Sequence, residues 1–195
     1  MQLYPLMLFV HVTSDIGIFI GIGVWLLGRM AVRRAQDVSQ VRALGGLIQR
    51  SEPLSGVSSL LTIARGLYML LTVWGWRTSW ALVALASVIV CLPPFLLGVI
   101  EPRMRSILRL AAEAPDGPVP ADLRTLIHDP LLGTSLQTMA AVVLGVVFLM
   151  TTKPPLTGAI AAMAAAIVLG VASGLPLARV RRGGTVSPEH TLSGE

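Results

Sequence analysis

The chain has few of the residues from which soluble enzymes and metal sites are built. Its 195 residues include one cysteine, three histidines and only 13% charged residues. With Cys91 alone, a disulfide within the chain and a zinc site made of several cysteines are excluded. A hydrophobic content of 54% lies outside the usual range of soluble domains. The low charge and the high hydrophobic content together indicate a protein that is embedded in a membrane.

Five long apolar runs dominate the sequence, and Asp15 and Arg65 are the only charged residues inside them. Each run is long enough to cross a hydrocarbon core of ~30 Å at ~1.5 Å per residue. We expect an all-α, polytopic membrane bundle that forms a single domain over residues 1–182, followed by a polar, disordered tail at 183–195. The predicted spans are Tyr4–Leu27, Leu54–Val73, Trp80–Ile100, Leu131–Met150 and Leu156–Leu177.

The basic residues outside these runs lie almost entirely on one side of them. Twelve of the fifteen Lys and Arg residues follow the first, third or fifth run, whereas the two short hairpins hold only Arg77 and Lys153. The positive-inside rule then predicts an outside N-terminus and a cytoplasmic C-terminus in the inner membrane. Because the basic residues flank apolar runs, the expected partner is the lipid bilayer and not nucleic acid.

The segments that connect the runs carry local signals as well. Residues 38–48 have apolar side chains at helical spacing, which predicts a short interfacial helix that is broken at Gly45 and Gly46. Asp129 and Pro130 stand directly before the fourth run. They are predicted to be the N-cap and the first residue of that helix.

Asp15 and Arg65 fall near the middle of consecutive antiparallel helices. An isolated charge at that depth costs several kcal/mol, about 3 on insertion scales, and pairing with an opposite charge reduces the cost. We therefore predict an Asp15–Arg65 contact, direct or through water. It would either fix the helix register or take part in function. His11 precedes Asp15 by four residues and shares its helix face.

Other polar and small residues extend this pattern. The polar residues could line a route for protons or a small solute, as in a small transporter or a membrane accessory subunit, or they could supply hydrogen bonds between helices. The small-residue pairs predict close helix packing, within the chain, in a homo-oligomer or with a partner in a membrane complex. The predicted polar core is Asp15, Arg65, His11, Thr62, Gln137 and Thr138, and the packing residues are Gly17, Gly21, Gly170 and Gly174.

Thioether and imidazole side chains suggest an alternative function. Met7, Met69 and Met150 are predicted at the depth of His11 on three different helices. Such ligands suit Cu(I), and a His/Met pair can ligate haem iron, so the alternative is a copper- or haem-handling membrane protein. The other two histidines lie outside the runs, which argues against a bis-histidine haem within one monomer. No nucleophile–base pair is present, so no catalytic residue is predicted and an enzyme is not expected.

Three segments carry a resemblance to a known family. They are LFVHVTSDIGIFIGIGVWLLGR, ARGLYMLLTVWGWRTSW and DPLLGTSLQTMAAVVLGVVFLMTTKPPL. Together they resemble a family of small bacterial integral membrane proteins of unknown function, which is similar to the membrane domain of copper-resistance D-type proteins. The resemblance implies a membrane helix bundle without an established catalytic motif. His11 matches the early histidine of copper- and haem-associated relatives, which implies copper or haem as a candidate cofactor.

Overall fold

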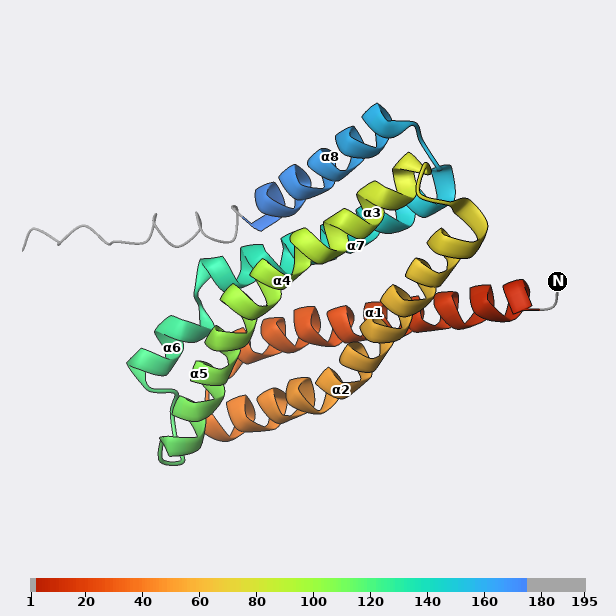
Figure 1. Cartoon of the computed structure of the whole chain (residues 1–195). Helices are drawn as coiled ribbons and strands as arrows, with labels where there is room; N and C mark the ends of the chain where they lie inside the picture. The colour runs from red at the N-terminus through yellow and green to blue at the C-terminus, as the bar shows by residue number, and fades with distance from the viewer. Residues whose placement is uncertain (1–2, 175–195) are drawn as a thin grey trace, which may run out of the picture.

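A computed structural model describes residues 3–174, which form helices and contain no strand (Figure 1). The predicted all-α class is therefore confirmed for this part of the chain. Two of the ten elements, η1 and η2, are short π-helical turns that continue a neighbouring α-helix. The elements are α1 (Leu3–Arg34), α2 (Val38–Met69), η1 (Leu70–Trp74), α3 (Ser79–Val90), α4 (Leu92–Phe95), η2 (Leu96–Ile100), α5 (Glu101–Glu113), α6 (Ala121–Ile127), α7 (Pro130–Thr152) and α8 (Leu156–Gly174).

Five helical segments within residues 3–174 are long and apolar enough to cross a membrane. Large apolar side chains cover their outer faces: Leu27, Leu60 and Leu169 are each about two-thirds exposed, at 68%, 70% and 67%. So much exposed apolar surface fits lipid as the surrounding solvent. Residues 175–195, with the end of the fifth predicted run and the predicted tail, lie outside the described residues. The segments are Pro5–Arg34, Val38–Trp74, Ser79–Glu113, Ala121–Thr152 and Leu156–Gly174.

Small residues bring α1 and α2 together as an antiparallel pair. A Cβ placed on Gly17 would lie 2.2 Å from Ser58 Oγ, and one on Gly21 would lie 1.8 Å from Ser55 Oγ. Glycine therefore permits a separation that other residues would prevent. These contacts also set the register of the two helices, which decides the residues opposite Asp15.

A second antiparallel pair is formed by α7 and α8. A Cβ on Gly170 would lie 2.5 Å from the Cα of Thr138, and one on Gly174 would lie 2.7 Å from the Cα of Thr134. Both predicted small-residue pairs thus lie at contacts within one chain. In the third span, α3, α4 and η2 pack along α7, whereas α5 packs against α2 and α6 (Figure 1).

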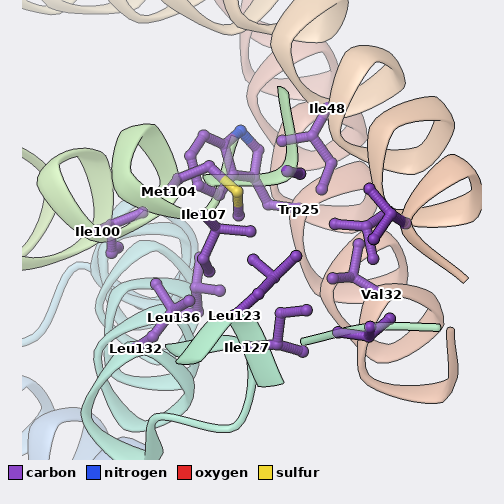
Figure 2. Close-up of a cluster of buried hydrophobic side chains, with 14 residues drawn as sticks. Trp25, Val32, Ile48, Ile100, Met104, Ile107, Leu123, Ile127, Leu132 and Leu136 are labelled. Carbon is purple, nitrogen blue, oxygen red and sulfur yellow. The ribbon is translucent and has the colours of Figure 1, made fainter. Parts of the chain in front are cut away.

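The basic end of the bundle is the end where α1 stops, α2 and α7 begin, and α5 and α6 lie. There the connecting segments form a packed core (Figure 2). The predicted interfacial helix with a break at Gly45 and Gly46 is wrong, because residues 38–48 are the first turns of a continuous α2. A Cβ on Gly45 would lie 2.2 Å from Leu108 Cδ2, so this glycine serves the contact with α5. The core includes Val38, Val41, Ile48, Ile100, Met104, Ile107, Leu123, Ile127, Leu132 and Leu136.

Arg42 ties the start of α2 to the end of α5 at the basic end. Its Nε donates to the carbonyl of Ala111 at 2.7 Å, and its Nη2 donates to the carbonyl of Ala114. Its Nη1 also pairs with Asp116 at 2.6 Å. The guanidinium thus satisfies carbonyls that the last turn of α5 leaves without helical partners.

Asp129 joins three helices at the same end. Its Oδ1 accepts a hydrogen bond from the amide of Leu131 at 2.8 Å, which confirms the predicted N-cap of α7. Its Oδ2 pairs with Arg103 Nε of α5 at 2.5 Å. Its backbone carbonyl accepts from Arg29 Nη2 of α1 at 3.1 Å. Arg29 is buried there beside Gly133, where any Cβ would lie 2.5 Å from the guanidinium.

The hairpin end lies opposite and contains the connections at residues 75–78 and 153–155. Gly75 and Lys153 have positive φ angles of 74° and 49°, which turn the chain sharply. The rings of Trp74 and Trp80 meet edge to face with their centroids 4.8 Å apart. Lys153 Nζ lies 5.9 Å from the centre of the Trp80 ring, so the two hairpins contact each other.

Candidate functional site

A cavity of about 290 Å³ lies between the α1–α2 pair and the third and fourth spans. It extends from Trp74 and Trp80 near the hairpin end to Leu97 in η2, and its walls are almost entirely apolar. Leu96 and Leu97, which line the cavity in η2, are 37% and 63% exposed, so this end of the cavity reaches the apolar outer surface of the bundle. A molecule could therefore enter it sideways from the lipid.

The polar corner of this cavity is formed by His11, Asp15, Ser59 and Thr62. Thr62 Oγ1 donates to Asp15 Oδ1 at 2.9 Å, which links α2 to α1. His11 Nε2 lies 3.8 Å from Asp15 Oδ2, too far for a hydrogen bond. His11 is only 5% exposed, and its Nδ1 has no hydrogen-bond partner. Polar atoms of His11 and Asp15 at this corner are thus left without hydrogen-bond partners.

The predicted direct Asp15–Arg65 contact is not formed. Among residues 3–174 no ion pair joins the two side chains, and the Nη1 of Arg65 donates to the sulfur of Met7 instead. The register set by Gly17 and Gly21 places Thr62 beside Asp15, so Arg65 lies about one helical turn nearer the hairpin end. Contact between the two charges through water stays a prediction.

The other half of the predicted polar core lies elsewhere. Gln137 Oε1 accepts from Ser173 of α8 at 3.1 Å. Thr138 is fully buried against α8, and its hydroxyl donates to the carbonyl of Thr134 at 2.8 Å. Neither residue lines the cavity. The polar residues therefore form two separate groups and not one row across the bundle.

The four predicted metal donors are not gathered in one place. His11 and Met150 line the cavity, but Met69 is 1% exposed and is not part of its wall. The sulfur of Met7 accepts from Arg65. Within residues 3–174 no group of three or more His, Cys, Asp and Glu side chains could hold a metal ion. This donor set does not fit a copper or haem centre built from all four residues.

Sequence reasoning missed Ser59 and the apolar wall that the third span contributes. Ser59 precedes Thr62 by three residues, so helical spacing alone would have placed it on the same face. The wall at Leu85, Val88 and Leu97 gave no such signal, because each of these residues resembles its lipid-facing neighbours in sequence. Only the packing of distant helices identifies them.

A second cavity, of about 700 Å³, lies at the basic end and is polar. Arg33, Arg124 and His128 line it together with Asp37. Arg33 and Arg124 take part in no ion pair within the described part of the chain. The two guanidinium groups outnumber the single carboxylate of Asp37, so the lining of this cavity carries a net positive charge.

No protein-family model matches the chain, and no curated protein or solved structure matches it either. A function must therefore be argued from the chemistry of the site. The apolar cavity with one polar corner is the feature on which that argument rests.

Proposed function

We propose that this chain is a multi-pass protein of the inner (cytoplasmic) membrane that binds a small lipophilic molecule in its lateral cavity. It would act as a small transporter of that molecule or as an accessory subunit of a membrane complex. The observation that carries the proposal is a cavity of about 290 Å³ with apolar walls and a mouth at the exposed Leu97. Apolar, largely preformed cavities are the usual sites of small-molecule binding.

The distribution of polar groups favours a lipophilic molecule over an ion or a proton pathway. An ion pathway needs polar groups spaced across the membrane. Here the polar side chains that line the cavity occupy a single corner, and Gln137 and Thr138 face α8. One observation favours the copper or haem alternative, because His11 and Met150 line the same cavity.

The proposed topology places the basic end in the cytoplasm and the hairpin end outside. We expect a membrane-impermeant maleimide to label Lys153→Cys from outside the intact cell, in a chain that carries Cys91→Ser. The matched variant Arg109→Cys, also at an exposed position but at the basic end, should react only after the membrane is opened. The physical reason is the excess of Arg at the basic end. Labelling of Arg109→Cys in intact cells would reverse the orientation.

Filling the cavity should block binding. Gly66 lines it, and a Cβ there would lie 3.6 Å from His11 Cε1, an ordinary contact, so Gly66→Leu adds volume at the cavity wall without a clash at its Cβ. In phosphatidylcholine nanodiscs, a photoreactive decyl diazirine should label cavity residues saturably. Gly66→Leu should reduce that labelling about tenfold, equivalent to about 1.4 kcal/mol of binding free energy.

Gly56→Leu is the matched control for this experiment. Gly56 lies on the same helix, has nothing within 4 Å of its Cβ position and does not line the cavity. Equal labelling of the two variants would mean that the cavity is not the binding site. A Soret band or stoichiometric copper in the purified protein, lost in His11→Ala, would replace the proposal by the copper or haem alternative.

A further inference from the structure

The polar corner lies deep in the proposed bilayer and not at its surface. Asp15 is ten residues from Pro5, where the first membrane-spanning segment begins, which is ~15 Å along the helix. His11 and Thr62 stand at a similar depth, because both contact or approach Asp15. A ligand that uses this corner must therefore carry its polar group into the hydrocarbon region.

Within residues 3–174, three side-chain polar atoms of His11 and Asp15 at this corner have no hydrogen bond, namely both ring nitrogens of His11 and Oδ2 of Asp15. His11 forms no hydrogen bond through either ring nitrogen within residues 3–174, although only 5% of the residue is exposed. Asp15 Oδ1 accepts from Thr62, whereas Oδ2 accepts no hydrogen bond within residues 3–174 and lies 3.8 Å from His11 Nε2. Buried polar groups normally have partners, because an unpaired one costs about 1–3 kcal/mol. One oxygen atom between Nε2 and Oδ2 could supply the bonds missing at these two atoms, whereas Nδ1 of His11 would keep none.

We propose that the cavity binds a neutral, chain-bearing molecule whose carbonyl or hydroxyl head enters between His11 Nε2 and Asp15 Oδ2. Lipid-soluble quinones and quinols are a class that combines such a head with an apolar chain, and they are the ligands tested below. A hydroxyl can donate to Asp15 and accept from a His11 N–H, whereas a carbonyl can accept from His11 and pairs with Asp15 only when that carboxyl is protonated. This inference rests on the proposed function and adds the chemistry of the ligand's head.

Depth and charge argue against the other membrane amphiphiles. A phospholipid keeps its charged headgroup at the interface, so its acyl chains would leave the polar corner without a partner. A charged head taken to this depth would carry a large desolvation cost. A plain hydrocarbon would fill the apolar walls but would leave His11 and Asp15 unsatisfied. Only a neutral hydrogen-bonding head meets both conditions.

Tryptophan fluorescence provides a direct measurement, because Trp74 and Trp80 line the cavity and quinones quench tryptophan emission. The full chain in phosphatidylcholine nanodiscs would be titrated with decyl-benzoquinone. We expect saturable quenching at ligand concentrations that give only weak, linear quenching of free tryptophan in the same nanodiscs. Decylbenzene, which has the same chain without the head, should compete about tenfold less well if the head forms one good hydrogen bond.

Variants locate the head within the cavity. Thr62→Val removes the hydroxyl that holds Asp15 in place, and His11→Gln replaces the imidazole. Each should weaken quinone binding about tenfold, which corresponds to one lost hydrogen bond, and leave competition by decylbenzene unchanged. Thr138→Val is the matched control, because Thr138 is buried on α7 outside the cavity. If His11→Gln fails to fold by circular dichroism, Thr62→Val carries the test.

The outcomes separate this inference from the proposed function. The role of the polar head would be overturned if decyl-benzoquinone and decylbenzene bound equally well, or if the folded variants kept the quinone affinity of the unchanged chain. Either result would still leave a cavity that binds lipophilic molecules. If neither molecule bound saturably and Gly66→Leu behaved like Gly56→Leu, the proposed function itself would be wrong. Selective loss of quinone binding in Thr62→Val supports both.

Discussion

Replacing Asp129 with alanine is expected to lower the free energy of unfolding by about 2–3 kcal/mol, because one side chain serves two helices. Its Oδ1 caps the first turn of α7 through Leu131, and its Oδ2 pairs with Arg103 of α5 at 2.5 Å. Both partners of the ion pair are largely shielded, with 30% and 23% of their side chains exposed. Chemical unfolding of the detergent-purified protein, followed by helical circular dichroism, measures the change.

Two further variants divide this effect into its parts. Asp129→Asn keeps an oxygen for the Leu131 amide but removes the charge, so we expect about half of the loss. Asp116→Ala breaks the Arg42–Asp116 pair, in which the carboxylate is 82% exposed, and should cost less than about 1 kcal/mol. The hydrogen bond from Arg29 to the backbone of residue 129 persists in all three variants. Similar losses in Asp129→Ala and Asp116→Ala would contradict the proposed role of Asp129.

Hydropathy was sufficient to predict the five spans, because the lipid-facing and buried sides of these helices are both apolar. It did not predict the packed core of the basic end. Arg29 and Arg42 look like ordinary flanking charges in the sequence, yet Arg29 is buried and Arg42 holds the last carbonyls of α5. Gly45 suggested a break, but contact with Leu108 explains it within a continuous helix. Both differences arise from packing between segments that are distant in sequence.

The candidate site could be predicted in part. Helical spacing places His11 and Asp15 on one face, and the structure brings both to the polar corner with Thr62. Arg65 was predicted as the partner of Asp15 because its depth in the membrane was counted from Leu54, the start of the apolar run. The helix itself begins at Val38. Pairing across two helices depends on their register, and that register is set by the contacts of Gly17, Gly21 and Gly28. An error of one turn is enough to exchange Thr62 for Arg65.

Glycine at position 170 should be essential for the α7–α8 pair. A Cβ there would lie 2.5 Å from the Cα of Thr138 and 3.1 Å from the Cβ of Ala141. The first contact is with backbone, so no side-chain rotation relieves it and the helices must separate. We expect Gly170→Ala to destabilise the protein by about 1–3 kcal/mol, and Gly170→Val by more, as for other overpacked interiors. The measurement is the same unfolding experiment in detergent.

Helix propensity alone predicts the opposite change in stability for Gly170→Ala, so the sign of the measured change tests the steric argument. Alanine is favoured over glycine within a helix by about 1 kcal/mol, so a substitution without steric conflict should stabilise the protein. Gly23 provides that control, since nothing lies within 4 Å of its Cβ position on α1. Gly23→Ala should therefore be neutral or stabilising while Gly170→Ala is destabilising. If both substitutions raised stability equally, α8 would not pack on α7 at Thr138, and the buried state of Thr138 would need another explanation.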